Sequence, residues 1–454
     1  MSEDDGVSNE PTASGLRSRV VAQMQVPLLR NAYSLVSSTM ANAALGLVFW
    51  VVAARVFHPT VVGRDSALIS AMTFVSVLAQ LNLNNGFNRF VPTAGSSTRR
   101  LVLAGYAAAI SLSLLAAGVF LAGVHVWTPR LGYLDHHPYE AAWFVVATMI
   151  WTVFVLEDSV LIGLGEAHWV LVENSIFGII KVGALVAIAT QIHRFGIFLA
   201  WTAPTILLVI PVNVYLFRKA IPRRSNHVPL ESLDARVIAR FVGPDFAAQM
   251  VRTATTSLTP IIVLAIAGSS ATAYAAIASM VGYTLYLLII NMGASLVTEA
   301  ARAPERLAEY TRRLLSHCFA IVVPLSLMLV IAAHFVLSLF GEEYPERAQV
   351  LLQLMALSAI PNVVVATFTS VARVRRRMGV VVATVTGTSG AVLVLTIVLL
   401  KAIGLDGVGL AWLIAQTASA IVIMFTGFRF LWMPGVQPLQ AAGSLANEDP
   451  RVDM

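Results

Sequence analysis

Short polar loops divide the sequence into a series of apolar runs, each about 20–26 residues long. A helix needs roughly 20 residues to cross the hydrocarbon layer of a membrane, so each run is long enough to span it. Only 12% of the residues are charged, whereas about 25% is usual in a soluble domain. The chain therefore cannot cover a water-facing surface with polar groups. Because backbone groups in lipid must be paired within a segment and no ten-residue alternation is visible, we predict helices and not a β-barrel.

The fold class predicted from these runs is an all-α polytopic membrane protein with about twelve transmembrane helices. We place the spans at residues 32–54, 67–87, 101–124, 141–164, 169–190, 195–217, 241–266, 271–297, 315–339, 348–371, 379–400 and 407–430.

The basic residues are unevenly shared between the two sets of loops that these spans create. Cytoplasmic loops of membrane proteins carry an excess of Lys and Arg, which sets the orientation. One set holds 22 basic residues, clustered around positions 17–30, 89–100, 218–240, 302–313, 373–377 and 429–451. The other set holds six, namely Arg55, Arg64, Arg130, Arg194, Arg347 and Lys401. We therefore expect both termini in the cytoplasm.

The chain ends and the residue usage indicate where such a protein would reside. Met1 to Gly15 is polar and has no apolar core, so we expect a disordered tail and no cleavable signal peptide. Cys318 is the only cysteine, so no intramolecular disulfide is possible. The chain has 27 Arg against three Lys, which suggests a GC-rich bacterial genome. We expect a multi-pass protein of the bacterial cytoplasmic membrane.

Short matches recur between the two halves of the chain at nearly constant spacing. Ala67–Ser70 recurs as Ala276–Ser279, 209 residues later, and Gly196–Trp201 recurs as Gly407–Trp412, 211 residues later. Six spans per half would make the two halves parallel repeats, an arrangement that places a substrate site near mid-bilayer. The expected parts are a cytoplasmic tail at 1–30, a first six-helix bundle at 31–217, a basic linker at 218–240, a second bundle at 241–430 and a cytoplasmic tail at 431–454.

Three segments resemble one known family. They are Pro59 to Pro92 (with Gly63, Leu81, Leu83, Arg89 and Phe90), Phe340-Gly341 with Tyr344, Leu351-Leu352 and Pro361, and the glycine-rich Gly407 to Trp412. Over roughly residues 30–430, the chain resembles the polysaccharide-biosynthesis transporters of the multidrug, oligosaccharidyl-lipid and polysaccharide exporter superfamily, including the O-antigen flippases. The resemblance implies two six-helix bundles around a central cavity and movement of a polyprenyl-linked oligosaccharide, or a related glycolipid, across the membrane by alternating access. Membrane lipids, the lipid-linked glycan and the enzymes that assemble it are the partners it implies.

Ionisable side chains inside spans are costly and mark the first candidates for a transport site. Arg252 lies about 16 Å into span seven, and Asp245, Gln249, Arg252 and Thr256 share one helix face. Span one carries a similar polar stripe, Asn31, Ser34, Ser38 and Asn42. Lys181 in span five lies at a depth similar to that of Arg252, and two cations at one depth suit a diphosphate headgroup. The alternatives are an ion pair of Arg252 with Asp245 or another acid, and of Lys181 with Glu173.

Three carboxylates form a second group of candidates. Glu157 and Asp158 lie near the cytoplasmic end of span four, and Glu173 lies at a similar level on span five. Such a group could couple transport to protons or sodium, or it could serve as a polar contact between helices.

The remaining motifs argue against catalysis and tight metal binding. The nine histidines show no HExxH or zinc spacing, and no Walker A sequence is present. We expect no enzyme activity, no cofactor and no metal site. The basic residues lie in separate short loops, so nucleic acid is not an expected partner. Besides a flippase, the alternatives are an ion-coupled multidrug-type exporter of the same superfamily, favoured by an acidic cavity, and a membrane enzyme, favoured by clustered carboxylates on an outer loop.

Overall fold

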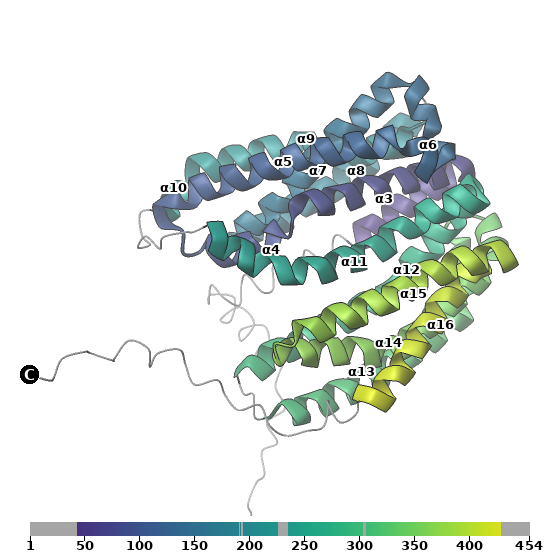
Figure 1. Ribbon diagram of the computed structural model, residues 1–454. Helices are drawn as coiled ribbons and strands as arrows, with labels where there is room; N and C mark the ends of the chain where they lie inside the picture. Colours follow the sequence, from purple (N-terminus) through teal and green to yellow (C-terminus); the bar gives the residue numbers. More distant parts are fainter. Residues whose placement is uncertain (1–42, 190, 192–193, 226–234, 303–305, 428–454) are drawn as a thin grey trace, which may run out of the picture. The chain divides into compact units, whose positions relative to one another are not determined.

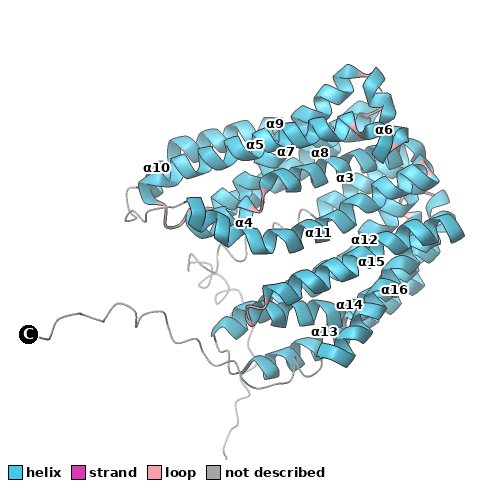
Figure 2. Cartoon of the chain, viewed as in Figure 1, coloured by secondary structure: helices cyan, strands magenta, loops and turns pink. Residues whose placement is uncertain are grey.

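The computed structural model describes residues 43–189, 191, 194–225, 235–302 and 306–427. Within these residues the chain forms only helices and loops (Figure 2). Eleven of the described helices are long and apolar enough to cross a membrane, and a shorter apolar helix covers Ala43–Val56. The all-helical, multi-pass membrane architecture predicted from the sequence is therefore confirmed.

The described chain divides into two compact units, residues 1–246 and 247–454. In the first unit the longer helices are α3 (Pro59–Gln80), α4 (Leu83–Phe90), α5 (Thr98–Ala122), α7 (Pro138–Gly163), α8 (Ala167–Ala189) and α9 (Gly196–Tyr215). Its shorter turns are η1 (Gly95–Ser97), α6 (Val124–Trp127), η2 (Pro129–His136), η3 (Leu216–Ala220) and α10 (Ile221–Ser225).

Helix α11 (Ala235–Ala267) contains the division between the units. The second unit continues with α12 (Ser269–Arg302), α13 (Leu307–Ser338), α14 (Glu343–Val374), α15 (Met378–Ile403), α16 (Asp406–Val422) and η5 (Ile423–Gly427). Helix α14 is the centre of this unit, because it packs against α12, α13, α15 and α16 (Figure 1).

The second predicted span is misplaced by eight residues at its start. Expected at 67–87, it is helix α3, Pro59–Gln80. Pro59 suits the first turn of a helix, and the ring of His58 accepts a hydrogen bond from the Thr60 amide. Arg64, which the charge count assigned to a loop, lies inside this helix.

The helix α3 ends where two residues adopt the left-handed conformation, Leu81 at φ 47° and Asn82 at φ 60°. Such a break stops the regular hydrogen bonding of a helix.

The ninth predicted span, at 315–339, also begins earlier in the structure, at Leu307.

The predicted linker at 218–240 is partly helical. Helical turns extend over Leu216–Ser225, and α11 begins at Ala235. Residues 226–234 lie outside the described part of the chain, as do both predicted cytoplasmic tails, 1–30 and 431–454.

The helix boundaries follow the 211-residue spacing of the repeat. Helices α7 and α14 end at Gly163 and Val374, and α8 and α15 begin at Ala167 and Met378, each pair 211 residues apart. Positions of α7–α9 can therefore be compared one by one with positions of α14–α16.

A buried carboxylate ties two helices of the first unit together. Phe195, which precedes α9, has a φ of 66° and supplies no capping side chain. Instead, the amides of Ile197 and Phe198 donate to Oδ2 of Asp65 on α3, at 3.0 and 3.1 Å. Asp65 is completely buried and so acts as the cap of a helix more than a hundred residues away in the chain.

Candidate functional site

The second unit contains a pocket of about 190 Å³. Helices α11, α12, α14, α15 and α16 all contribute side chains to it. Its polar lining consists of Arg252, Thr255, Thr256, Tyr283, Tyr286, Asn362, Thr369, Ser370, Arg373, Thr388, Ser389, Trp412 and Gln416. None of the described residues that line it is acidic, so the lining carries positive charge only.

Arg252, the leading candidate from the sequence, borders this pocket together with Thr256. Its guanidinium donates a hydrogen bond to Oε1 of Gln249, which lies one turn earlier on the same helix. The structure therefore brings three members of the predicted polar stripe together. The fourth, the side chain of Asp245, lies outside the described residues, as do Asn31, Ser34, Ser38 and Asn42.

Arg373 is the second cation of the pocket. It stands near the end of α14, and the sequence placed it in a basic loop. Two guanidinium groups in one concave site provide planar, permanently charged donors of the kind that bind phosphate oxygens.

Two lining residues carry buried polar atoms that have no hydrogen-bond partner in the structure. These atoms are Nε1 of Trp412 and Oδ1 of Asn362. The Asn362 amide nitrogen donates to Oε1 of Gln416 at 3.1 Å, so only its oxygen is left over. Leaving a buried donor or acceptor unpaired costs about 1–3 kcal/mol.

Lys181 does not line this pocket; it is buried in the first unit, with 1% of its side chain exposed. Its ammonium nitrogen lies 5.5, 4.8 and 4.1 Å from the ring centroids of Phe49, Phe177 and Trp201, which we call the aromatic cage. Among the described residues no carboxylate forms an ion pair with it, so the pairing with Glu173 considered from the sequence is absent there. Cation–π contacts of this kind contribute up to about 2 kcal/mol when they are desolvated.

The repeat relates residues that line the pocket to residues around Lys181 in the first unit. At a spacing of 211 residues, Trp201 corresponds to Trp412 and Lys181 to Val392. Phe177 likewise corresponds to Thr388, and Trp151 to Asn362. Thr388, Val392, Asn362 and Trp412 all line the pocket. Asn362, Thr388 and Val392 are smaller than Trp151, Phe177 and Lys181, so they leave more space beside Trp412 than their counterparts leave beside Trp201.

The three predicted carboxylates do come together, in the first unit. Glu157 and Glu173 are 0% and 2% exposed, and Glu157 interacts electrostatically with both Glu173 and Asp158. Amide groups are the neighbours that donate to this carboxylate cluster. Asn213 donates to Glu157, and Asn174 donates to Asp158 at 3.2 Å.

The carboxylate cluster has no cationic partner, since none of its three members forms an ion pair among the described residues. Buried carboxylates that lack a cation must take up protons or bind an ion. The described residues contain no group of three or more His, Cys, Asp or Glu side chains arranged to hold a metal ion.

The sequence reading missed most of the pocket. Asn362 and Gln416 are amides in the middle of apolar spans, and such residues are themselves markers of a functional surface. In the sequence, Trp412 stands out only within the Gly407–Trp412 segment of the repeat and of the family resemblance. The polar stripes of spans one and seven were predicted as candidates, but the amides of α14 and α16 were not.

No protein-family model and no curated protein sequence matches this chain. Solved structures do match its fold. An inward-facing multidrug resistance MATE family transporter of the MOP superfamily superimposes with a TM-score of 0.62 at 13% identity, covering 90% of this chain and 98% of that one. The chain has a MOP-type fold.

Two further structures extend this comparison. The lipid II flippase MurJ, in an inward closed conformation, matches with a TM-score of 0.62 at 15% identity over 86% of each chain. A MOP superfamily transporter from Pyrococcus furiosus, whose description reports a binding pocket of reverse polarity, matches with a TM-score of 0.56 at 13% identity, covering 90% of this chain and 95% of that one. At such low identity these matches establish the fold and leave the substrate to the chemistry of the pocket.

Proposed function

We propose that this protein is a membrane transporter that moves a polyprenyl-linked oligosaccharide, or a related anionic glycolipid, across the cytoplasmic membrane by alternating access. The observation that carries the proposal is the charge of the pocket in the second unit. Two arginines line it, and none of its described lining residues is acidic. A diphosphate linkage offers the oxygen atoms that guanidinium groups bind in pairs.

The same observation argues against a multidrug exporter of organic cations. A cation entering a low-dielectric pocket beside Arg252 and Arg373 would meet repulsion, and none of the described lining residues offers a compensating carboxylate. The fold is shared by structures described as multidrug transporters and by one described as a lipid flippase, so fold alone favours neither function.

We further propose that the carboxylate cluster of Glu157, Asp158 and Glu173 couples transport to protons or to sodium. Its members are buried, close together and without a cationic partner among the described residues. Binding a cation removes repulsion within such a cluster, and releasing it restores that repulsion. A site with two charge states can therefore bias a conformational equilibrium.

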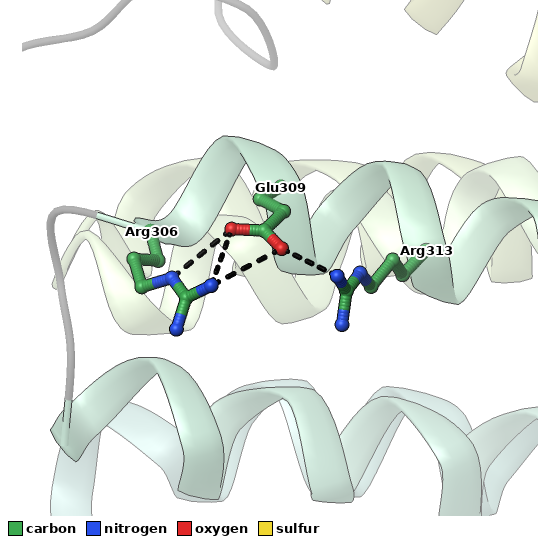
Figure 3. A network of polar contacts seen from close by, with 3 residues as sticks. All are labelled: Arg306, Glu309 and Arg313. Carbon is green, nitrogen blue, oxygen red and sulfur yellow. Dashed lines mark hydrogen bonds and ion pairs between the residues drawn. The ribbon is translucent and has the colours of Figure 1, made fainter.

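The proposed substrate is tested by reconstituting the purified protein into liposomes and measuring the flipping of a fluorescent polyprenyl diphosphate-linked sugar. Arg252→Ala should abolish flipping while leaving the amount of folded, incorporated protein unchanged. The matched control is Arg306→Ala. Arg306 is exposed and, as Figure 3 shows, shares the carboxylate of Glu309 with Arg313 on the first turns of α13. Normal flipping by Arg252→Ala, or transport of a cationic dye in place of the lipid, contradicts the proposal.

A further inference from the structure

Besides two arginines, neutral polar side chains line the pocket of the second unit. Binding of a diphosphate by the arginines gives these neutral side chains no role. Trp412 and Gln416 lie one helical turn apart on α16, and Asn362 faces them from α14 through its hydrogen bond to Gln416. Trp412 and Asn362 are only 6% and 8% exposed. Both border the pocket, and each has a buried polar atom without a partner.

The two unpartnered atoms have opposite hydrogen-bonding character. The indole Nε1–H of Trp412 can only donate, and Oδ1 of Asn362 can only accept. Phosphate oxygens can satisfy the indole but not the amide oxygen. A quaternary ammonium ion can satisfy neither. A hydroxyl group both donates and accepts, so a ligand that carries several hydroxyls has the chemistry to pair with both atoms when the two buried side chains turn toward it.

We propose that Trp412, Asn362 and Gln416 form a subsite for a neutral pyranose ring, and that this subsite selects the sugar next to the diphosphate. The inference rests on the proposed function, because the subsite would bind the sugar of the same substrate whose diphosphate the arginines bind. The hydroxyl groups of Thr388 and Ser389 also line the pocket and widen the set of partners available to a sugar. The space exists because Asn362, Thr388 and Val392 stand where the first unit has Trp151, Phe177 and Lys181.

The experiment compares three probes on the purified protein by calorimetry. They are farnesyl diphosphate and its derivatives with one glucose or one N-acetylglucosamine on the terminal phosphate. We expect at least one glycosylated probe to bind the wild type about tenfold more tightly than farnesyl diphosphate. Trp412→Phe keeps an aromatic ring but removes the N–H, and Asn362→Leu removes the acceptor. Each should reduce that preference to near unity.

Trp201→Phe is the matched control. Trp201 is the repeat equivalent of Trp412, and its Nε1 is also buried without a partner, but it does not line the pocket. This variant should keep the full preference for the glycosylated probe. Thermal midpoints of all variants show whether each one is folded.

The outcomes separate the subsite from the proposed function. Loss of binding of all three probes in Arg252→Ala supports recognition of the diphosphate by the arginines, whether or not the probe carries a sugar. Equal affinity of the wild type for all probes, or a sugar preference that survives both Trp412→Phe and Asn362→Leu, overturns the subsite while the proposed function stands. Binding of farnesyl diphosphate that does not depend on Arg252 overturns the proposed function itself.

Discussion

Trp201 and Trp412 occupy equivalent positions of the repeat, yet the Trp201 ring lies 4.1 Å from the ammonium nitrogen of Lys181 whereas Trp412 borders an open pocket. Equivalent positions of the repeat therefore have different surroundings in the two units. In the first unit a lysine fills the space beside the tryptophan. In the second, a valine leaves that space empty.

Lys181 should contribute to the packing of the first unit and not to substrate binding. Replacing it with alanine removes most of a fully buried side chain, so the stability should fall by roughly 2 kcal/mol or more. Lys181→Met keeps the length and avoids burying a charge. We expect this variant to retain the thermal midpoint and the flipping rate of the wild type. A folded Lys181→Met protein that no longer flips lipid would instead place Lys181 in the transport path.

Arg252 should not be replaceable by lysine. A guanidinium offers two parallel donors to a phosphate, and an ammonium acts as a point charge. Flipping by Arg252→Lys should therefore be lower than that of the wild type by about tenfold, between the values for the wild type and for Arg252→Ala. Initial rates in liposomes test this expectation, and equal rates for lysine and arginine would show that charge alone is sufficient.

The buried carboxylate cluster should determine the energy source. In Glu157→Gln the amide cannot exchange a proton or bind a cation in the same way, so flipping should no longer respond to an imposed pH or sodium gradient. The control is Glu309→Gln, which alters an exposed carboxylate on α13. A gradient response that persists in Glu157→Gln would indicate that the cluster only holds α7, α8 and α9 together.

The glycines of the Gly407–Trp412 segment should be required for packing. A β-carbon at Gly409 would lie 2.7 Å from the Leu351 carbonyl oxygen on α14, which leaves no room for alanine. We expect Gly409→Ala to lower the stability by about 1–3 kcal/mol. Gly387→Ala is the matched control, because a β-carbon there meets nothing within 4 Å; thermal unfolding in detergent should show it to be neutral or stabilising.

Tyr133 should stabilise the first unit through its ring and not its hydroxyl. The guanidinium carbons of Arg64 and Arg194 lie 5.1 and 5.6 Å from the ring centroid, while the hydroxyl is buried without a partner. Tyr133→Phe should therefore be neutral or stabilising, and Tyr133→Leu should cost about 1 kcal/mol.

The effect of these two substitutions should also be independent of pH below the ordinary pKa of a phenol, about 10. Burial raises the pKa of Tyr133 above that value, so the hydroxyl is neutral in both the folded and the unfolded state under such conditions. Thermal midpoints measured at pH 6 and at pH 9 test this point.

The helical membrane fold could be predicted from the sequence because lipid leaves few alternatives for long apolar runs. The boundaries were less predictable where a polar residue lies inside a helix. Arg64 was predicted to lie in a loop, but the ring of Tyr133 accommodates it within α3, and two backbone amides accommodate the neighbouring Asp65. Such compensation comes from segments far away in the chain and leaves no local pattern.

The candidate site could be predicted from the sequence only in part. A charge within a span is conspicuous, so Arg252 was found together with Thr256. Asn362, Gln416 and Trp412 are uncharged, and only the packing of α14 against α16 brings them to one pocket. Lys181 was expected to line a cavity because its depth matches that of Arg252, but depth along a helix does not specify which neighbours surround the side chain.

The cap that Asp65 provides for α9 bears on how the first unit assembles during synthesis. Amides at the start of a helix are unpaired until something accepts from them, and the hydrocarbon layer offers no acceptor. The acceptor for Ile197 and Phe198 sits on a helix that leaves the ribosome much earlier. The amides of Ile197 and Phe198 can therefore form these hydrogen bonds only after the sixth span reaches its early neighbour.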